Sequence, residues 1–368
     1  MNKIPSHFHG SDLEKIAKHY HIPQDSLVNF AANVNPLGLS EGVKDKIAAN
    51  LHLISTYPDR EYTSLRKTIA SYCNIRMEHI IVGNGSSELI ALLIEQCFPK
   101  KTLILGPTYS EYERELSFSN SSIEFYNLKS ENDFSLDLEC LKDKLKENYD
   151  LLILCNPNNP TSSFIKNEEI RQLLECCKNH HTFMMIDETY VEFMPDCKQA
   201  SSMSLIEKYS NLMVLRGVSK FFAAPGLRFG YGATSNLSFL KKMKNAQIPW
   251  SLNSIAAYAG ELMLVDKPYI LATKKLIEDE KRQLLFELKK LSKVSVFPAN
   301  ANFILLQVLD KNLNASDVFL ACLKEGLLIR DCSSFQNLDG EFIRFCIMNP
   351  EDNLRLLKVL VGLFGTLL

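Results

Sequence analysis

The residues best suited to chemistry are a lysine and an arginine eight positions apart, Lys220 and Arg228. Lys220 follows the apolar run 212–215, which predicts a buried strand, and Gly226 and Gly230 indicate tight turns. A lysine held near the interior has a lowered pKa and can attack a carbonyl. The planar guanidinium of Arg228 suits a phosphate. Together they predict a Schiff-base lysine beside a phosphate-binding arginine, as pyridoxal phosphate (PLP) requires. A surface lysine and a salt-bridged arginine would explain this stretch alone equally well.

A glycine and two hydroxyl residues, Gly85, Ser86 and Ser87, join a predicted strand over 80–83 to a predicted helix over 88–94. The start of a helix presents free amide groups and the positive end of its dipole, so this junction predicts an anion site. The alternative is an ordinary helix cap made by one of the two serines.

Further apolar runs over 102–105, 151–155 and 183–186 predict strands that are buried on both faces of a mostly parallel sheet. Ligands bind beyond the carboxyl ends of the strands in such sheets. We expect one site there, because polar or aromatic residues follow each strand: Ser86, Tyr109, Asn159, Asp187, Tyr190 and Lys220.

The N-terminal part offers weaker candidates. Asn33 lies in an asparagine-rich turn, whose buried amides need hydrogen-bond partners that a ligand can supply. His9 and Gly10 belong to a tail or to a weak two-histidine metal site. Tyr57 precedes a proline and is expected to point outward, where a neighbouring subunit would have to provide its role.

The C-terminal part predicts a smaller α+β lobe. Its expected elements are a helical region that follows 249–253 and runs to about 291, strands over 294–297, 302–308, 326–330 and 342–346, and a helix over 317–325. Arg330 and Arg344 lie in apolar stretches, and an arginine there is rarely buried without a partner. The lysines of 241–244 are expected to form a solvated face.

Composition excludes several classes of protein. The 368 residues are 46% hydrophobic, which allows a large core, and the formal net charge of −2 gives no electrostatic footprint for nucleic acid. No apolar run could span a membrane, and the first residues lack a signal-peptide pattern, so we expect a cytoplasmic protein. The ten cysteines show no metal-ligand spacing, and no metal site is expected.

From about Val28 to Asn349 the sequence resembles the fold-type I PLP-dependent enzymes of the class I/II aminotransferase superfamily. Four motifs carry the resemblance: Asn84-Gly85-Ser86-Ser87-Glu88, Asn156-Pro157-Asn158-Asn159-Pro160-Thr161, Asp187-Glu188-Thr189-Tyr190, and Ser219-Lys220 with Gly226-Leu227-Arg228. The resemblance implies an α/β fold with a large, mostly parallel sheet. It implies a PLP-binding domain over 40–250 and a smaller α+β domain formed by 1–39 and 251–368.

The resemblance also implies roles for single residues. Lys220 would bind the cofactor covalently, and Asp187 would pair with its ring nitrogen. Tyr190 and Asn159 would contact the phenolic oxygen, and Tyr109 would stack on the ring. The phosphate would be held by Gly85, Ser86, Ser87, Ser219 and Arg228, and by Tyr57 from a partner subunit, which implies a homodimer. The substrate would meet His9, Gly10, Asn33, Asn159, Arg330 and Arg344.

Three positions depart from the family pattern. Gly217 stands where relatives often carry a hydroxyl, so one phosphate contact is expected to be missing. Ser162 replaces a glycine, which is tolerable if its φ is negative. Ser11 replaces the glycine that follows His9-Gly10 in one subfamily.

Two subfamilies compete. Arg330-Asp331 with Arg344 resembles histidinol-phosphate aminotransferase, which transfers an amino group to 2-oxoglutarate. His9-Gly10, the stretch 30–38 and the stretch 215–222 are more similar to L-threonine-O-3-phosphate decarboxylase of cobalamin synthesis. We therefore expect decarboxylation of threonine phosphate, with serine phosphate second. A non-catalytic ligand-sensing domain is the remaining class, but such regulators add a DNA-binding segment for which the sequence before the fold leaves no room.

Overall fold

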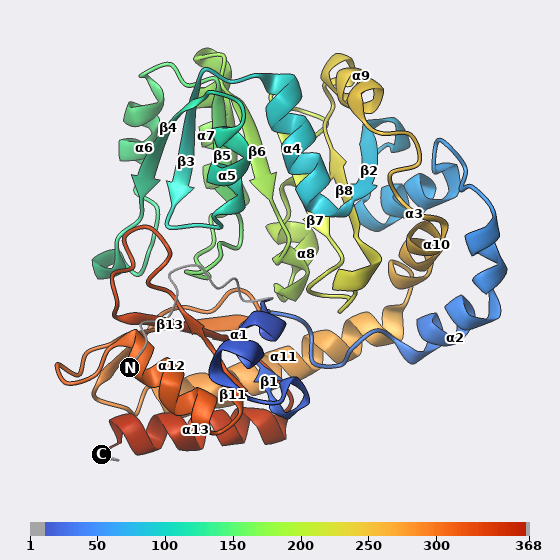
Figure 1. Cartoon of the computed structure of the whole chain (residues 1–368). Coiled ribbons are helices and arrows are strands. Elements are labelled where there is room, and N and C mark those ends of the chain that lie inside the picture. The colour runs from blue at the N-terminus through green and yellow to red at the C-terminus, as the bar shows by residue number, and fades with distance from the viewer. Residues whose placement is uncertain (1–11, 366–368) are drawn as a thin grey trace.

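The computed structural model describes residues 12–365. Two lobes are visible in Figure 1, one around a seven-stranded sheet and one around a four-stranded sheet. This confirms the expected α/β class with a large, mostly parallel sheet and a smaller α+β lobe. We propose that the lobes divide near residues 40 and 250, as the sequence predicts.

The large sheet has the strand order β2-β8-β7-β6-β5-β3-β4. Only β8 runs antiparallel to its neighbours; the other adjacent pairs are parallel. The strands are β2 (Ile80–Asn84), β3 (Lys101–Gly106), β4 (Ser122–Asn127), β5 (Leu151–Cys155), β6 (Phe183–Asp187), β7 (Leu212–Gly217) and β8 (Phe229–Ala233). Because β2, β3, β5, β6 and β7 point the same way, their carboxyl ends share one edge of the sheet.

Helices cover both faces of this sheet, which explains its continuous apolar strands. Side chains alternate along each strand, so that Met213 packs on one face and Val214 on the other. The Met213 face meets α4 (Gly85–Cys97), α5 (Glu111–Ser117) and α9 (Leu237–Ala246). The Val214 face meets α3 (Thr63–Cys73), α6 (Leu138–Leu145), α7 (Asn167–Asn179) and α10 (Ser254–Met263).

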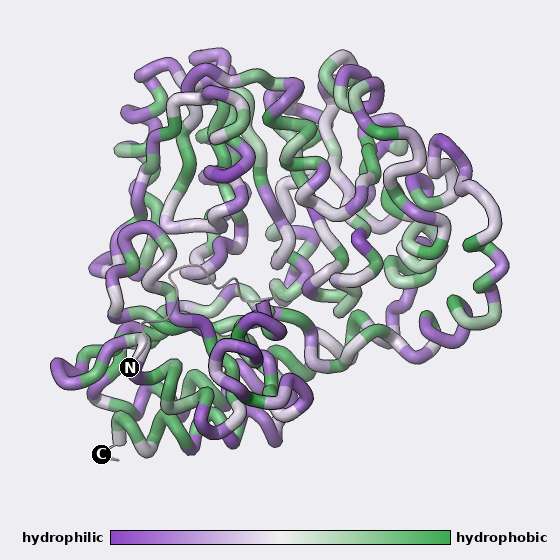
Figure 2. Tube along the Cα trace, in the orientation of Figure 1, coloured by the Kyte–Doolittle hydropathy of each residue, from purple (hydrophilic) through white to green (hydrophobic). Residues whose placement is uncertain are grey.

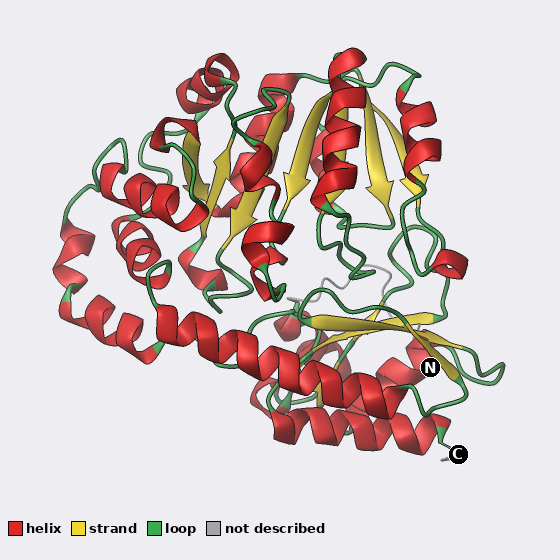
Figure 3. Ribbon diagram, turned by 180° about the vertical axis from the view of Figure 1, so that it is seen from behind, coloured by secondary structure: helices red, strands yellow, loops and turns green. Residues whose placement is uncertain are grey.

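The small sheet is antiparallel, in the order β12-β13-β10-β9. Its strands are β9 (Val294–Val296), β10 (Phe303–Val308), β12 (Arg330–Asp331) and β13 (Phe342–Cys346). The helices α11 (Lys267–Leu288) and α13 (Pro350–Phe364) lie below it in Figure 3, and α12 (Ala315–Lys324) also belongs to this lobe. The N-terminal strand β1 (Val28–Asn29) pairs in parallel with β11 (Leu327–Leu328), and α1 (Leu13–Tyr20) precedes it.

Several local predictions were incomplete. Gly230 does not form a turn: it lies in β8, where a Cβ atom would come within 2.4 Å of the Ser86 amide nitrogen. The helical region after 249 is two helices, α10 and α11. On α9, Lys241 is exposed as expected, but Lys244 is half-buried rather than fully solvated. The helices α2 (Glu41–Ala49) and α8 (Cys197–Ala200) complete the set in residues 12–365.

Apolar residues concentrate along the strands in Figure 2, and polar residues concentrate in the outer turns. Among the helices of residues 12–365, none combines the length and the apolar character needed to cross a membrane.

Candidate active site

Lys220 lies three residues beyond the end of β7, at the shared edge of the large sheet. It is half-buried, and its Nζ donates a hydrogen bond of 2.6 Å to the carbonyl oxygen of Ala32. Burial, together with the nearby charge of Arg344, lowers the pKa of Lys220 to about 8. A fraction of this amine is therefore neutral near physiological pH, as a nucleophile requires.

Asp187 ends β6, the strand next to β7, and is buried. Its carboxylate accepts hydrogen bonds from the Tyr112 hydroxyl (2.8 Å) and from the amide and hydroxyl of Thr189 (2.9 and 2.5 Å). Burial raises the pKa of Asp187, and these donors counteract the shift. A protonated ring nitrogen is a cation that would stabilise this buried carboxylate.

A candidate phosphate cup forms where α4 begins. Arg228 has a left-handed backbone (φ 54°), and its guanidinium lies so close to Gly85 that a Cβ atom there would be 2.6 Å from Nη2. Gly217 lies beside Ser86, whose Oγ would be 3.4 Å from an added Cβ. The guanidinium, a hydroxyl and the free amides of the helix start thus share one place, which suits a dianion.

Neither serine caps this helix. The N-cap of α4 is Asn84, and both Ser86 and Ser87 lie inside the first turn. The capping explanation for these serines is therefore wrong. Instead, the Glu88 carboxylate accepts a hydrogen bond from the Asn84 amide at 2.6 Å. The hydroxyl of half-buried Ser86 remains for another partner.

The N-terminal segment lies between the two lobes. The buried Asn33 has a positive φ of 56° and donates from Nδ2 to the Tyr190 hydroxyl at 3.2 Å. Asn302 donates to the Asn33 carbonyl at 3.0 Å. Among residues 12–365, neither the Asn33 Oδ1 nor the Asn302 Oδ1 has a hydrogen-bond partner. Buried polar atoms of this kind are expected where a ligand binds.

Arg344 is a buried cation that has no carboxylate partner within residues 12–365. It donates from Nη1 to Asn159 and from Nη2 to the Ala31 carbonyl (2.6 Å), and its Nε lacks a partner among the described residues. It faces Arg330 directly in the register of β12 and β13. Arg330 donates a hydrogen bond from Nη2 to the Ser334 hydroxyl (2.6 Å), and its guanidinium lies over the Phe335 ring. Burial and the charge of Arg344 lower the pKa of Arg330.

The remaining predicted residues are placed as follows. Tyr109 is half-buried and meets the Tyr112 ring edge-on at 5.6 Å. Ser219 is half-buried beside Lys220, whereas Ser87 is exposed. Tyr57 is 80% exposed, as expected of an outward tyrosine. His9, Gly10 and Ser11 lie outside the described residues.

The condition set for Ser162 is not met, since its φ is +56°. Its hydroxyl explains how a non-glycine residue is held there. The Ser162 Oγ accepts hydrogen bonds from the amides of Asn300 and Ala301, each at 2.8 Å. Ser162 therefore connects two parts of the molecule: the loop that contains Asn159 and the small lobe.

Sequence reasoning assigned no role to three of the residues that support the site. Thr189, two positions after Asp187, could have been found as an Asx-type turn partner. Tyr112 lies on the buried side of α5, and Asn302 precedes β10. No local pattern distinguishes these last two from ordinary core residues.

The residues present fit PLP. Asp187 offers an anion for the ring nitrogen, Lys220 an amine with a lowered pKa, and Gly85, Ser86 and Arg228 a cup for the phosphate. Position 85 requires glycine, because only glycine leaves room there for the guanidinium of Arg228.

Comparisons with known proteins identify the family of the chain. The family profile "Aminotransferase class I and II" matches residues 25–360. Threonine-phosphate decarboxylase of Salmonella typhimurium is 31% identical and aligns over 96% of this chain and 95% of its own length. A Caldanaerobacter subterraneus protein, provisionally named a threonine-phosphate decarboxylase, is 37% identical over 90% of this chain and 89% of its own. Histidinol-phosphate aminotransferase from Clostridium acetobutylicum has a similar structure, with a TM-score of 0.85, 33% identity and coverage of 91% and 98%.

The match spans both lobes. The chain belongs to the aminotransferase class I and II family of PLP-dependent enzymes.

Proposed function

We propose that the chain decarboxylates an O-phosphorylated amino acid to a phosphorylated amino alcohol, with L-threonine O-3-phosphate as the first substrate and L-serine O-phosphate as the second. The product would serve cobamide biosynthesis. The observation that carries the proposal is the cross-strand pair of Arg330 and Arg344. Two relatives with threonine-phosphate decarboxylase names support it.

Like charges directly opposite each other on neighbouring strands are destabilising. Arg330 and Arg344 have hydroxyl, amide and carbonyl partners rather than carboxylates. A bound dianion would offset this cost, and a phosphate monoester can accept from both guanidinium groups. A substrate that carries only a carboxylate would occupy one of the two arginines.

When bound, PLP supplies an electron sink for the bond at Cα that stands perpendicular to its ring. In the proposal, Arg330 and Arg344 hold the substrate phosphate, which leaves the carboxylate without an in-plane anchor and places it in the perpendicular position. Asn33 donates to the Tyr190 hydroxyl, and this hydrogen bond would hold the N-terminal segment beside the cofactor. Lys220 then delivers a proton to Cα after carbon dioxide leaves, a role that a pKa of about 8 permits.

Histidinol-phosphate aminotransferase is the second candidate. The observation in its favour is the structural similarity to the Clostridium enzyme, together with the contact between Arg344 and Asn159. In the half-reaction with 2-oxoglutarate and glutamate, Arg344 would hold the α-carboxylate in the ring plane, so that the Cα–H bond is perpendicular and Lys220 would move that proton. Histidinol phosphate has no carboxylate, and its phosphate would bind to the arginine pair. Substrate orientation decides between the two reactions.

The test is to incubate the purified holoenzyme with threonine phosphate, serine phosphate, or histidinol phosphate plus 2-oxoglutarate. Carbon dioxide and the phosphorylated amino alcohol are expected from the first two. Glutamate formation from the third substrate, without carbon dioxide from the others, would replace the proposal with the aminotransferase.

A variant links the reaction to the arginine pair. Arg330→Ala should lower kcat/KM for threonine phosphate at least about tenfold, because a hydrogen bond to a charged group contributes roughly 1.5–3 kcal/mol. The same change should affect the slow turnover of unphosphorylated threonine little. Arg355→Ala, at an exposed arginine of α13, is the matched control. Equal losses with both substrates would show that Arg330 does not bind the phosphate.

A further inference from the structure

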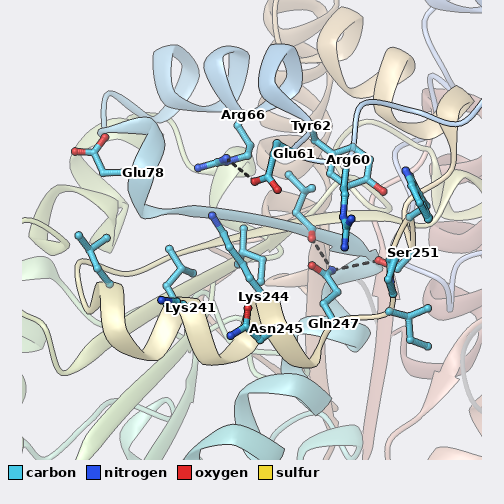
Figure 4. A pocket seen from close by; sticks show the side chains of 17 residues that line it. Arg60, Glu61, Tyr62, Arg66, Glu78, Lys241, Lys244, Asn245, Gln247 and Ser251 are labelled. Atoms are coloured by element: carbon cyan, nitrogen blue, oxygen red, sulfur yellow. Dashed lines mark hydrogen bonds and ion pairs between the residues drawn. The ribbon is translucent and has the colours of Figure 1, made fainter.

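A cavity of about 560 Å³ lies apart from the cofactor residues, between the start of α3, strand β2 and the end of α9. Figure 4 shows its walls. Its lining includes Arg60, Arg66, Lys241, Lys244, Gln247 and Trp250, but none of the residues predicted to bind PLP or substrate.

The lining carries more positive than negative charge. Four basic side chains face two acidic ones, Glu61 and Glu78. Both carboxylates already lie near arginines: Glu61 is 3.8 Å from Arg66, and Glu78 is 3.4 Å from Arg76, outside the lining. More than half of each carboxylate side chain is exposed to solvent. The cavity therefore keeps an uncompensated positive charge.

The Arg66 guanidinium in this cavity is only partly paired: its Nη2 donates to the Met77 carbonyl at 2.9 Å, but its Nε lacks an acceptor among residues 12–365. The Arg66 side chain is only 11% exposed. Lys244 points toward Arg66 from the opposite wall, and Arg60 lies to one side of this pair and extends toward Gln247 (Figure 4). In the described chain neither Arg60 nor Lys244 forms an ion pair within 4 Å. Burial, together with the charge of Arg66, lowers the pKa of Lys244.

Partly buried cations that repel one another are unfavourable unless an anion accompanies them. We propose that this cavity binds a small oxyanion with at least two negative charges, either a phosphate compound or a polycarboxylate. Arg60, Arg66 and Lys244 would donate to it from opposite walls. The lining shares no residue with the proposed substrate site of the same chain, and the proposal does not depend on the reaction type.

The chain carries its own probe for this site. Trp250, the single tryptophan, lines the cavity, and the Arg60 guanidinium lies 5.6 Å from its ring centroid. An anion that draws Arg60 away from the ring should change the Trp250 fluorescence. The holoenzyme is titrated with pyrophosphate and, separately, with citrate, while sodium chloride keeps the ionic strength constant.

We expect a saturable fluorescence change in the holoenzyme. Lys244→Ala should weaken the apparent affinity about tenfold, as the loss of one charge-assisted hydrogen bond predicts. Lys242→Ala is the matched control, since it removes an equal charge from the neighbouring exposed position outside the lining. A response to only one of the two anions identifies the ligand class.

Two results would overturn the site. One is the absence of a saturable change with either anion, and the other is an equal effect of Lys244→Ala and Lys242→Ala. The anion could also bind at Arg330 and Arg344. The Arg330→Ala variant distinguishes the two sites, because it should leave the Trp250 response unchanged.

Discussion

At the scale of residues, the site depends on charges held where water is scarce. Lys220, Arg330 and Arg344 lie near one another, and Asp187 is the buried carboxylate of the same region. Each of them needs a partner of opposite charge, and the cofactor and an anionic substrate would provide these partners. The cost of their burial in the empty protein is therefore part of the binding specificity.

Lys220→Met tests this view. The variant should lose turnover, and without cofactor it should be more stable than the wild type at pH 7, by about 1–3 kcal/mol. The folded pKa of about 8 is below the usual 10.5, so the folded state binds fewer protons between these values. Wild-type stability should thus rise with pH across 8 to 10.5, and the difference should vanish near 10.5. Urea unfolding of the apoproteins measures this; a pH-independent difference would contradict the assigned cause.

At the scale of elements, the loop between β5 and α7 connects the lobes. Ser162 has a left-handed backbone conformation there, and its hydroxyl accepts hydrogen bonds from two backbone amides of the small lobe. Asn159, in the same loop, contacts Arg344. Movement of this loop would therefore shift a substrate-binding arginine.

Ser162→Ala should destabilise the protein more than Ser162→Gly. Both variants remove the Oγ acceptor of the Asn300 and Ala301 amides, at a cost of about 1–3 kcal/mol. Only glycine also removes the strain of a positive φ, worth roughly 1 kcal/mol. Thermal unfolding measures the order, and KM for threonine phosphate should rise in both variants. An alanine variant as stable as the glycine variant would show that the backbone at 162 adapts without strain.

The strands and helices also show which structural features sequence patterns can predict. Buried strands such as β5 and β6 are continuous apolar runs, and the polar residues that follow them converge as expected. Strand β8 was missed because Gly230 and Gly232 suggest turns, although they are needed for close packing against Ser86 and Leu215. The supporting role of Tyr112 depends on a contact 75 positions away, which local periodicity cannot contain.

At the scale of the whole molecule, we propose a homodimer that shares its active sites. Tyr57 packs on Trp250 with ring centroids 4.8 Å apart, yet it is 80% exposed. Nearby on the chain, Ile54 and Ile248 are also exposed, at 68% and 73%. Exposed apolar groups on two adjoining segments suit an interface with a second copy. In the proposal, Tyr57 reaches the cofactor phosphate of the partner.

Mixing subunits tests this. Tyr57→Phe and Lys220→Ala subunits should form mixed dimers in which one site carries both defects and the other carries neither. Activity should then exceed the sum of the parents and approach about a quarter of wild type. Light scattering should give twice the chain mass. A monomeric mass, or activities that merely average, would exclude shared sites.

The hydrogen bond between Lys220 and Ala32 joins two segments that are synthesised at very different times. The segment around Ala32 leaves the ribosome early, Lys220 and Arg228 much later, and Arg344 almost last. The segment around Ala32 must therefore wait without this contact while every strand of the large sheet except β8 is made. Since chains grow at about 5–20 residues per second, this wait lasts on the order of ten seconds or more. The residues around Gly85 and Arg228 can therefore come together in a nascent chain before Arg330 and Arg344 are made.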